Sequence, residues 1–343
     1  MHLIPDLSLG PNLAVFAVIA LVIAVVGTRL TEVADNLADR TGLGEAVIGA
    51  VLLGAATSLP GIVVSVTAGW RGEAELAMSN ALGGIAVQTL FLAVADVVYR
   101  RANLEHAAAS TANLAQSALL IILLAILLVA PYSPALTIAG IHPATIVLFA
   151  GYAFGLRVAN DAEQLRMWTP RNTEETREDE PDSQALNQPV APLWTRFIGL
   201  AAVLGVTGYI LTNIASRLGH QTGMGETAVG IVLTSVVTSL PELVTSIAAV
   251  RRGALQLAVG GIIGGNAFDC LFAGAADVAY RDGSIYHAVS DPTLLWVALS
   301  VLMTGVLLLG LIRREKRGLG NVGFESASIA ALYVLGVTLS LLV

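Results

Sequence analysis

Long apolar stretches recur along the whole chain and limit what it can fold into. The sequence has 343 residues, 55% of them hydrophobic and 13% charged, and its mean hydropathy is +0.77. A run of about twenty apolar residues crosses a hydrocarbon core of about 30 Å as an α-helix, because a helix rises about 1.5 Å per residue. In lipid a helix pairs its own backbone amides and carbonyls. The sequence therefore predicts an all-α polytopic membrane protein.

Charged residues and Gly/Pro breaks separate the apolar windows, each of which predicts one transmembrane helix. The ten windows are 11–38, 43–69, 76–99, 110–130, 138–158, 195–219, 224–250, 255–280, 290–313 and 324–343. Between the fifth and sixth windows, the stretch 159–194 is rich in acidic residues and proline and poor in apolar ones. This composition predicts a soluble linker.

The lysines and arginines predict how the chain is oriented, because cytoplasmic loops carry an excess of basic residues. With the N-terminus outside, the fifteen basic residues on the cytoplasmic side are Arg29, Arg40, Arg100, Arg101, Arg157, Arg166, Arg171, Arg177, Arg196, Arg251, Arg252, Arg313, Arg314, Lys316 and Arg317. The three on the other side are Arg71, Arg217 and Arg281. The asymmetry predicts that both termini lie outside and that the acidic linker is cytoplasmic.

The sequence also contains an internal duplication. Residues 41–60, TGLGEAVIGAVLLGAATSLP, match residues 222–241, TGMGETAVGIVLTSVVTSLP, without a gap. The same offset of 181 residues continues through the segments 41–100 and 222–281. A match of this length indicates that one half of the chain is a copy of the other.

The duplication predicts the domain organisation. The first repeat, 1–158, and the second, 195–343, each hold five predicted helices. Because five is odd, the second repeat enters the membrane with the opposite orientation. We therefore expect ten helices in two five-helix inverted-topology repeats, an arrangement typical of secondary transporters whose site lies at the repeat interface.

Both copies carry the tetrapeptide Thr-Ser-Leu-Pro within an apolar run. Proline removes a backbone donor and displaces the carbonyl four residues before it, so both helices are predicted to break at mid-membrane. Freed carbonyls and hydroxyls are costly in lipid unless they bind each other, water or an ion. The alternative is that the hydroxyls bond back to their own helices. The candidate cation ligands are Thr57, Ser58, Thr238 and Ser239.

Two carboxylates of the second copy lie deep within apolar windows. Glu242 directly follows the tetrapeptide, and Asp269 ends the stretch Gly-Gly-Asn-Ala-Phe-Asp. A charged side chain at this depth costs several kcal/mol, so both residues are predicted to face a cavity, a cation or a proton. The alternative is a protonated carboxyl bound to a neighbouring hydroxyl. Glu242 and Asp269 are the candidate metal ligands.

Two matched aspartates, Asp96 and Asp277, are each followed by Tyr-Arg near a predicted helix end. We interpret them as structural, and predict that they pair with Arg100 and Arg281.

The paired segments resemble the alpha repeats of the calcium/cation antiporter superfamily, which includes the sodium/calcium exchangers. The resemblance is carried by Thr-Ser-Leu-Pro-Glu at 238–242 and by Gly-Gly-Asn-x-x-Asp at 264–269. It implies ten helices with a cytoplasmic linker, and a diamond of oxygen ligands for calcium and sodium. The residues to which it assigns ligand roles are Thr57, Ser58, Thr238, Ser239, Glu242 and Asp269.

The first copy departs from the family pattern. Gly61 stands at the position that matches Glu242, and Gln88 at the position that matches Asp269. One expected carboxylate is therefore absent, although calcium could still find six to eight oxygens among carboxylates, hydroxyls, carbonyls and water. Gln88 is a candidate ligand in place of an acid.

Three further positions complete the candidate site. Gly84 and Gly265 stand where the family has serine, and either allow close helix packing or offer carbonyl ligands. Asn266 keeps the residue that follows this serine in the family, which makes its side chain a candidate ligand.

The leading hypothesis is a secondary cation antiporter that works by alternating access and exchanges calcium, or a related cation, for sodium or protons. The alternatives are a proton-coupled exchanger of monovalent or other divalent cations, and a degenerate membrane scaffold that transports nothing. A membrane enzyme is disfavoured because no catalytic motif is present. Expected partners are small inorganic cations and the lipid bilayer, without nucleic acid or a resident cofactor. We expect an integral protein of the inner (plasma) membrane of a prokaryote.

The orientation can be tested by labelling a cysteine introduced as Ser183→Cys in the linker. An impermeant thiol reagent added to intact cells should leave this cysteine unmodified, because the basic residues hold the linker in the cytoplasm. Permeabilised cells provide the control in which it reacts. Modification in intact cells would reverse the predicted orientation.

Overall fold

The structure is a computed structural model of the whole chain. The residues it describes are 8–41, 57–99, 101–165, 170–171, 173, 189–318 and 322–342. Within these ranges the secondary structure is helical throughout, without a β-strand. Most of the predicted linker and part of the second predicted helix lie outside the described residues.

The helices of the first repeat begin and end close to the predicted windows. They are α1 (Leu9–Thr41), α3 (Leu59–Trp70), α4 (Ala74–Val98), α5 (Leu104–Ala108), α6 (Thr111–Val129) and α7 (Pro143–Leu165). Those of the second repeat are α8 (Val190–Thr222), α9 (Glu226–Ala228), α10 (Ser235–Thr238), α11 (Leu240–Arg252), α12 (Leu255–Ala279), α13 (Ile285–Ala288), α14 (Asp291–Arg313) and α15 (Phe324–Leu342). A π-helical turn, Val229–Thr234, joins α9 to α10.

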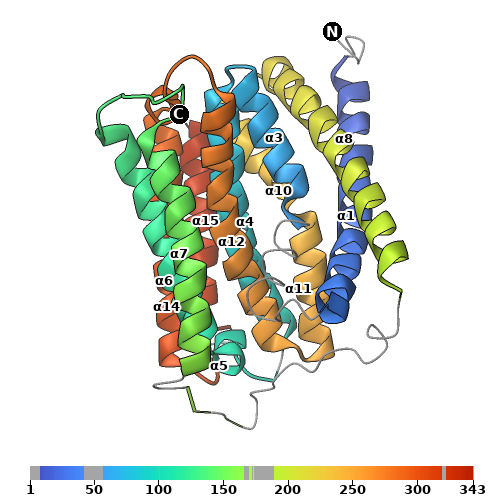
Figure 1. Cartoon of the computed structure of the whole chain (residues 1–343), viewed down its shortest axis with the longest axis vertical. Helices are drawn as coiled ribbons and strands as arrows, with labels where there is room; N and C mark the ends of the chain where they lie inside the picture. The colour runs from blue at the N-terminus through green and yellow to red at the C-terminus, as the bar shows by residue number, and fades with distance from the viewer. Residues whose placement is uncertain are drawn as a thin grey trace.

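Seven helices in the described part of the chain are long and apolar enough to cross a membrane, or eight if the bent pair around Ser239 forms one span. The number of ten stays a prediction, because α3 is short and the residues before it are not described. The start of α1 and the end of α15 lie at the same end of the molecule, as an even number of crossings requires (Figure 1).

The duplication extends to the helix boundaries. Leu9–Thr41 and Val190–Thr222 have the same length and the same offset as the sequence repeat, and so have Ala74–Val98 and Leu255–Ala279. The short helices α5 and α13 also start at matched residues. The two halves therefore share one pattern of helices, as the inverted-repeat hypothesis requires.

Three predicted windows differ from the structure. Helix α7 begins at Pro143 and not at 138, because Ala139 and Gly140 have φ of 55° and 80°, which no α-helix contains. It then continues to Leu165, and α8 begins at Val190 and not at 195, so both ends of the stretch assigned to the linker are helical. The window 224–250 is a bent, interrupted helix, with the break at the predicted proline motif.

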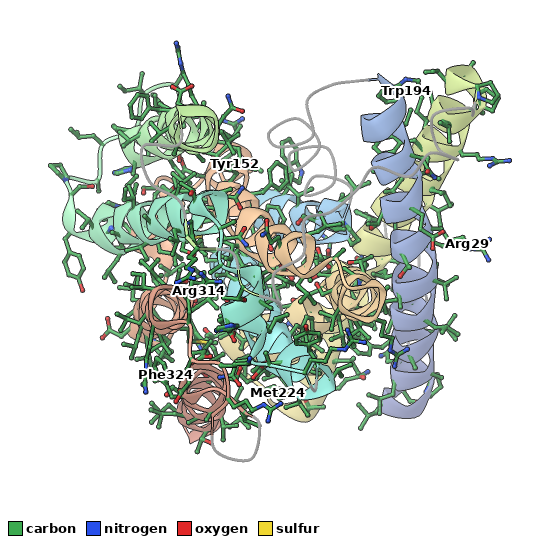
Figure 2. All side chains as sticks on the ribbon, turned by 90° about the horizontal axis from the view of Figure 1, so that it is seen from below. Arg29, Tyr152, Trp194, Met224, Arg314 and Phe324 are labelled. Carbon is green, nitrogen blue, oxygen red and sulfur yellow. The ribbon has the colours of Figure 1, made fainter. Side chains whose placement is uncertain are left out.

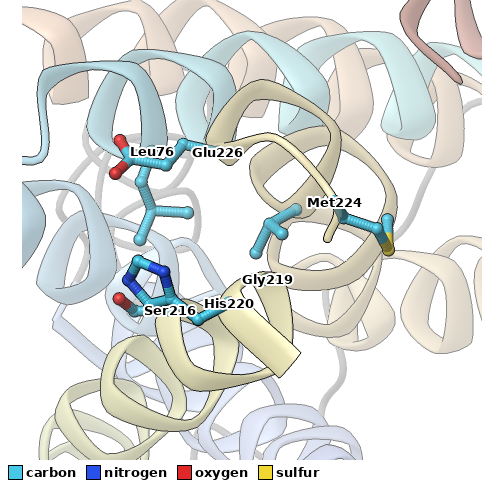
Figure 3. Close-up of a pocket in the computed structure, with 7 residues that line it drawn as sticks. Leu76, Ser216, Gly219, His220, Met224 and Glu226 are labelled. Carbon is cyan, nitrogen blue, oxygen red and sulfur yellow. The ribbon is translucent and has the colours of Figure 1, made fainter. Parts of the chain in front are cut away.

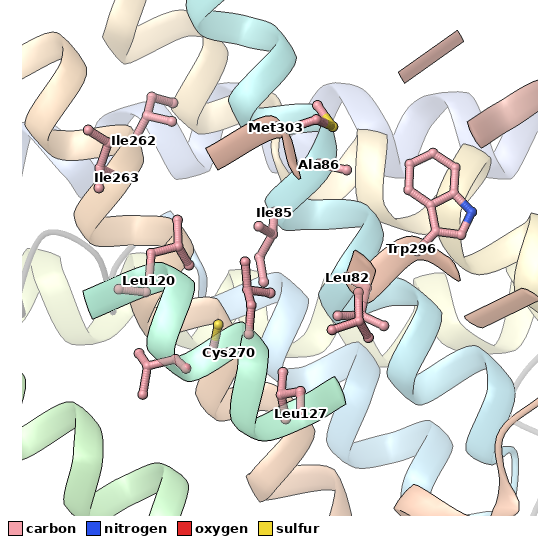
Figure 4. Packing of buried hydrophobic residues seen from close by; sticks show 14 of the residues in the cluster. Leu82, Ile85, Ala86, Leu120, Leu127, Ile262, Ile263, Cys270, Trp296 and Met303 are labelled. Atoms are coloured by element: carbon pink, nitrogen blue, oxygen red, sulfur yellow. The ribbon is translucent and has the colours of Figure 1, made fainter. Parts of the chain in front are cut away.

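The long helices α1 and α8 lie side by side along one edge of the molecule (Figure 1). Seen from below, Arg29 of α1 and Trp194 of α8 mark this edge (Figure 2). Helices α4 and α12 pack against each other at the centre, and α6, α7 and α14 form the opposite side. The central helices carry the apolar core, in which Ile85, Ile262 and Cys270 are fully buried (Figure 4).

Glycines allow α1 and α8 to touch the two proline motifs. Gly27 of α1 packs against the Pro241 ring so closely that no side chain fits between them. Gly208 of α8 does the same at the first motif, where a Cβ would lie 2.9 Å from the Pro60 carbonyl oxygen. Gly27 and Gly208 are matched residues of the repeats, so each long helix contacts the broken helix of the other half.

Asp96 ties the first repeat to the second. Its Oδ1 accepts a hydrogen bond from the Leu104 amide at 2.7 Å, at the start of α5. Its Oδ2 accepts bonds from the Gly323 amide at 3.2 Å and the Ser326 hydroxyl at 2.9 Å, both at the start of α15.

Asp277 makes the mirrored set of bonds. Its Oδ1 accepts from the Ile285 amide at 3.3 Å, and its Oδ2 from the His142 amide at 2.8 Å and the Thr145 hydroxyl at 2.7 Å, at the start of α7. The predicted pair with Arg281 is wrong, because among the described residues this carboxylate bonds to these three donors and forms no ion pair with Arg281. For Asp96 the predicted partner, Arg100, lies outside the described residues.

The close crossing predicts that a single methyl group at Gly208 destabilises the protein. In detergent, Gly208→Ala should lower the melting temperature by several degrees, because overpacking typically costs about 1–3 kcal/mol. Gly205→Ala is the matched control, since a Cβ there meets no atom within 4 Å. Equal melting temperatures of the two variants would contradict the crossing.

Candidate functional site

The second proline motif breaks its helix as predicted. Helix α10 ends at Thr238, α11 begins at Leu240 with Pro241 in its first turn, and the segments on either side of Ser239 are bent by 46°. The π-helical turn just before the break adds a further irregularity, which is frequent at functional sites. In the first copy, α3 likewise begins directly after Ser58, with a proline in its first turn.

The two repeats meet at a hydrogen bond between matched residues. Gln88 of α4 donates from Nε2 to Asp269 Oδ2 of α12 at 2.6 Å, and the two residues are 181 positions apart. At 1.5 Å per residue, Asp269 lies about 21 Å from the start of α12 and about 15 Å from its end. The contact is therefore near the middle of both central helices.

Asp269 has a donor on each carboxylate oxygen. The Ser58 hydroxyl donates to Oδ1 at 2.6 Å, and Gln88 occupies Oδ2. Gln88 Nε2 also donates to Ser239 Oγ at 3.2 Å, so this contact set joins both proline motifs. Hydrogen bonds to an ionised acceptor are roughly twice as strong as neutral ones. The network can thus hold a buried Asp269 carboxylate, of which 1% is exposed.

Glu242 has a poorer environment. Its side chain is 4% exposed, and neither carboxylate oxygen has a hydrogen bond of normal length and angle among the described residues. The Thr57 hydroxyl interacts with this carboxylate, and Asp269 is near enough to act on it electrostatically. A buried carboxylate with so little compensation is expensive unless it takes up a cation or a proton.

Three amide oxygens of α4 and α12 are also buried without a hydrogen-bond partner among the described residues. They are Asn80 Oδ1, Gln88 Oε1 and Asn266 Oδ1. Buried acceptors of this kind can bind a water molecule or a cation. Carboxylate and amide oxygens are also the ligands that hard cations such as Ca²⁺ prefer.

Two other predicted ligands are engaged elsewhere. The Thr238 hydroxyl donates to the Ser235 carbonyl of its own helix at 3.2 Å, which is the back-bonding alternative for this residue. Asn266 donates from Nδ2 to Thr89 Oγ1 at 2.9 Å, so only its Oδ1 remains open.

The two predicted glycines lie beside the central contact. A Cβ at Gly84 would be 3.4 Å from Asp269 Oδ2, and one at Gly265 would be 3.4 Å from Gln88 Oε1. Both positions therefore border the polar side chains that meet there. Ligation by their carbonyls stays a prediction.

Asn80 is a residue of this region that the sequence analysis missed. Its Nδ2 donates to the Gly61 carbonyl at 3.1 Å and to Ser65 Oγ at 3.0 Å, which fixes α3 against α4. The available signal was a polar amide inside an apolar window, because such a group is retained in a membrane helix only with partners.

Among the described residues, no three His, Cys, Asp or Glu side chains form a group that could hold a metal ion. A cation at the centre would therefore take most of its ligands from hydroxyl, amide, carbonyl and water oxygens. This donor set is suited to calcium or sodium and unlike the nitrogen and sulfur sites of transition metals.

A separate small pocket with a cavity volume of about 30 Å³ lies at one end of the bundle (Figure 3). Its lining consists of Leu76, Ser216, Gly219, His220, Met224, Glu226 and Val229. Burial raises the pKa of Glu73, which lies just before α4, and the positive charge of Arg71 opposes this shift. Leu76 and Gln88 are about 18 Å apart along α4, so the pocket is distinct from the central contact.

Comparison with known proteins gives matches over nearly the whole chain. The sequence model of the sodium/calcium exchanger protein family matches residues 11–156 and 192–342. The "Putative antiporter CaxA" of Alkalimonas amylolytica is 26% identical over 314 residues, which cover 88% of this chain and 92% of that protein. The "Inner membrane protein YrbG" of Escherichia coli (strain K12) is 28% identical over 242 residues, or 70% of this chain and 71% of that protein.

The fold is similar to that of a solved exchanger. The crystal structure of the H+/Ca2+ exchanger CAX superposes with a TM-score of 0.65 and 14% sequence identity, over 96% of this chain and 86% of that one. At this identity the likeness concerns the fold alone.

Proposed function

Because the chain belongs to the sodium/calcium exchanger protein family, an integral membrane family of cation exchangers, we propose that it is a secondary antiporter that exchanges calcium, or a related cation, for sodium or protons by alternating access. The observation that carries this proposal is the buried Glu242 carboxylate, which lacks a normal hydrogen bond and lies near the Asp269 contact between the repeats.

The charges of the two acids supply the reason for exchange. Bare Glu242 and Asp269 together carry −2, and a low-dielectric interior amplifies their repulsion. The carrier is then costly to reorient unless a cation or protons occupy the site. One ion must therefore replace another, which couples the two fluxes.

The charge of −2 on the two acids favours an exchange cycle that moves little net charge across the membrane. One calcium ion, two monovalent ions or two protons each neutralise −2, whereas additional sodium ions would leave uncompensated positive charge. We propose protons as one exchange partner, because the buried Glu242 carboxylate lacks the hydrogen bonds that would hold it ionised.

Two alternatives remain as outcomes of the tests. Exchange of a monovalent or another divalent cation would use the same residues with a different selectivity. A scaffold that transports nothing would have no use for an uncompensated intramembrane carboxylate.

We place the protein in the inner membrane of a prokaryote with both termini outside. The support is the similarity to an inner membrane protein of Escherichia coli and the distribution of basic residues.

The carboxylates provide the first functional test. Glu242→Gln and Asp269→Asn should each reduce calcium-45 exchange in proteoliposomes to the level of protein-free vesicles, because each removes half of the charge of the site. Glu32→Gln and Asp161→Asn, which alter exposed carboxylates, are the matched controls. Wild-type exchange by both site variants, with normal incorporation into the vesicles, would refute the assignment.

Ion coupling provides the second functional test. An imposed pH gradient should drive calcium uptake without sodium, and clamping the membrane potential at two values should change the rate less than about twofold, since little net charge crosses. Uptake that requires sodium, ignores pH and rises steeply with potential would contradict the charge argument.

A further inference from the structure

The space beside Gly61, where the matched position of the second repeat carries Glu242, is filled by an aromatic ring. A Cβ built on Gly61 would lie 2.7 Å from Cε2 of Phe272 and 3.5 Å from its Cζ. Real Cβ atoms do not approach a ring carbon at 2.7 Å, so even alanine at position 61 would require the ring to move. Phe272 belongs to α12, which also carries Asp269.

From this contact we propose that Phe272 fills the space that a carboxylate at position 61, matching Glu242, would occupy. Phe272 is thereby a specificity-determining residue of the cation site. The inference rests on the proposed function, and it deepens it: the site is restricted to the side of Glu242 and Asp269, and accepts cations of total charge +2 in one cycle.

Neighbouring aromatic rings hold the Phe272 ring in place. Phe272 is 3% exposed and packs edge to face with Phe268, at 6.1 Å between ring centroids and 87° between planes. Phe268 in turn packs against Tyr152 of α7 at 6.1 Å. The row of three rings leaves Phe272 little freedom to withdraw from Gly61.

The backbone at Gly61 is equally fixed. Asn80 holds the Gly61 carbonyl at 3.1 Å and the Ser65 hydroxyl at 3.0 Å. These bonds fix α3 to α4 at Gly61. A side chain at position 61 and the ring at position 272 compete for the same volume.

The mirrored position in the second repeat cannot have this arrangement. The residue matched to Phe272 is Phe91, which is also buried, but its partner position carries Glu242 with a Cβ. Phe91 therefore cannot approach the backbone there as Phe272 approaches Gly61. One side of the site has a carboxylate and the other an apolar wall, beside which extra positive charge is unfavourable.

The first part of the test measures packing without any ion. The melting temperatures of wild type, Gly61→Ala, Phe272→Ala and the double variant form a cycle. Gly61→Ala should lower the melting temperature by several degrees in the wild-type background and have no effect when Phe272 is alanine. Equal effects in both backgrounds would overturn the contact. If Phe272→Ala fails to fold, Phe272→Leu takes its place, because leucine lacks the ring edge.

The second part measures calcium affinity of the purified protein by calcium-45 binding. Gly61→Glu/Phe272→Ala should bind calcium at least about tenfold more tightly than wild type, because a third carboxylate joins the site, and Gly61→Glu alone should show no such gain. Gly61→Gln/Phe272→Ala is the matched control for size without charge, and it should also show no gain.

Three outcomes would overturn the proposal. They are a full gain in Gly61→Glu alone, an equal gain in the glutamine control, and no gain in the glutamate double variant despite coupled melting temperatures. Failure of the proposed function is distinguishable, because wild-type protein would then move no cation in proteoliposomes under any gradient.

Discussion

The structure depends on keeping a carboxylate in the middle of an apolar bundle. Asp269 meets this requirement with donors from the other repeat, Ser58 and Gln88, each at 2.6 Å. The central helices α4 and α12 are therefore joined at their midpoints by a polar contact that needs both halves of the chain. Glu242 lacks such compensation, and the contrast between the two acids makes the centre of the bundle suited to taking up and releasing positive charge.

The backbone of the molecule is more symmetric than its chemistry. The helices α1 and α8 repeat residue for residue, and so do the crossings at Gly27 and Gly208. The Thr-Ser-Leu-Pro motif repeats at the centre, but the acidic positions do not, since Gln88 faces its matched Asp269 and Gly61 stands where the second repeat has Glu242. The helices are thus duplicated, while both carboxylates of the proposed site, Glu242 and Asp269, come from the second half alone.

Much of this could be predicted from the sequence, because the deciding signals are local. Apolar runs predict the helices, and the proline motif predicts the break at Ser239. An acid at the centre of an apolar window predicts that Asp269 lies among polar groups. The packing of Phe272 on Gly61 and the bonds of Asn80 could not be predicted, since they join residues from different helices. The start of helix α7 was predicted wrongly because the turn before it needs positive φ values at Ala139 and Gly140. An alanine in a sequence does not indicate a positive φ.

The hydrogen bonds that Asp96 and Asp277 accept from the other repeat have a consequence for how the protein is made. Asp277 holds the start of α7 from the first repeat, and Asp96 holds the start of α15 from the second. A nascent chain inserted into the membrane from its N-terminus thus carries α7 without its final partner until α12 has also been synthesised. The bonds of Asp96 to the start of α15 can form only after this last helix has been synthesised. The bonds that join the two halves through Asp96 and Asp277 can therefore form only after most of the second half has been synthesised.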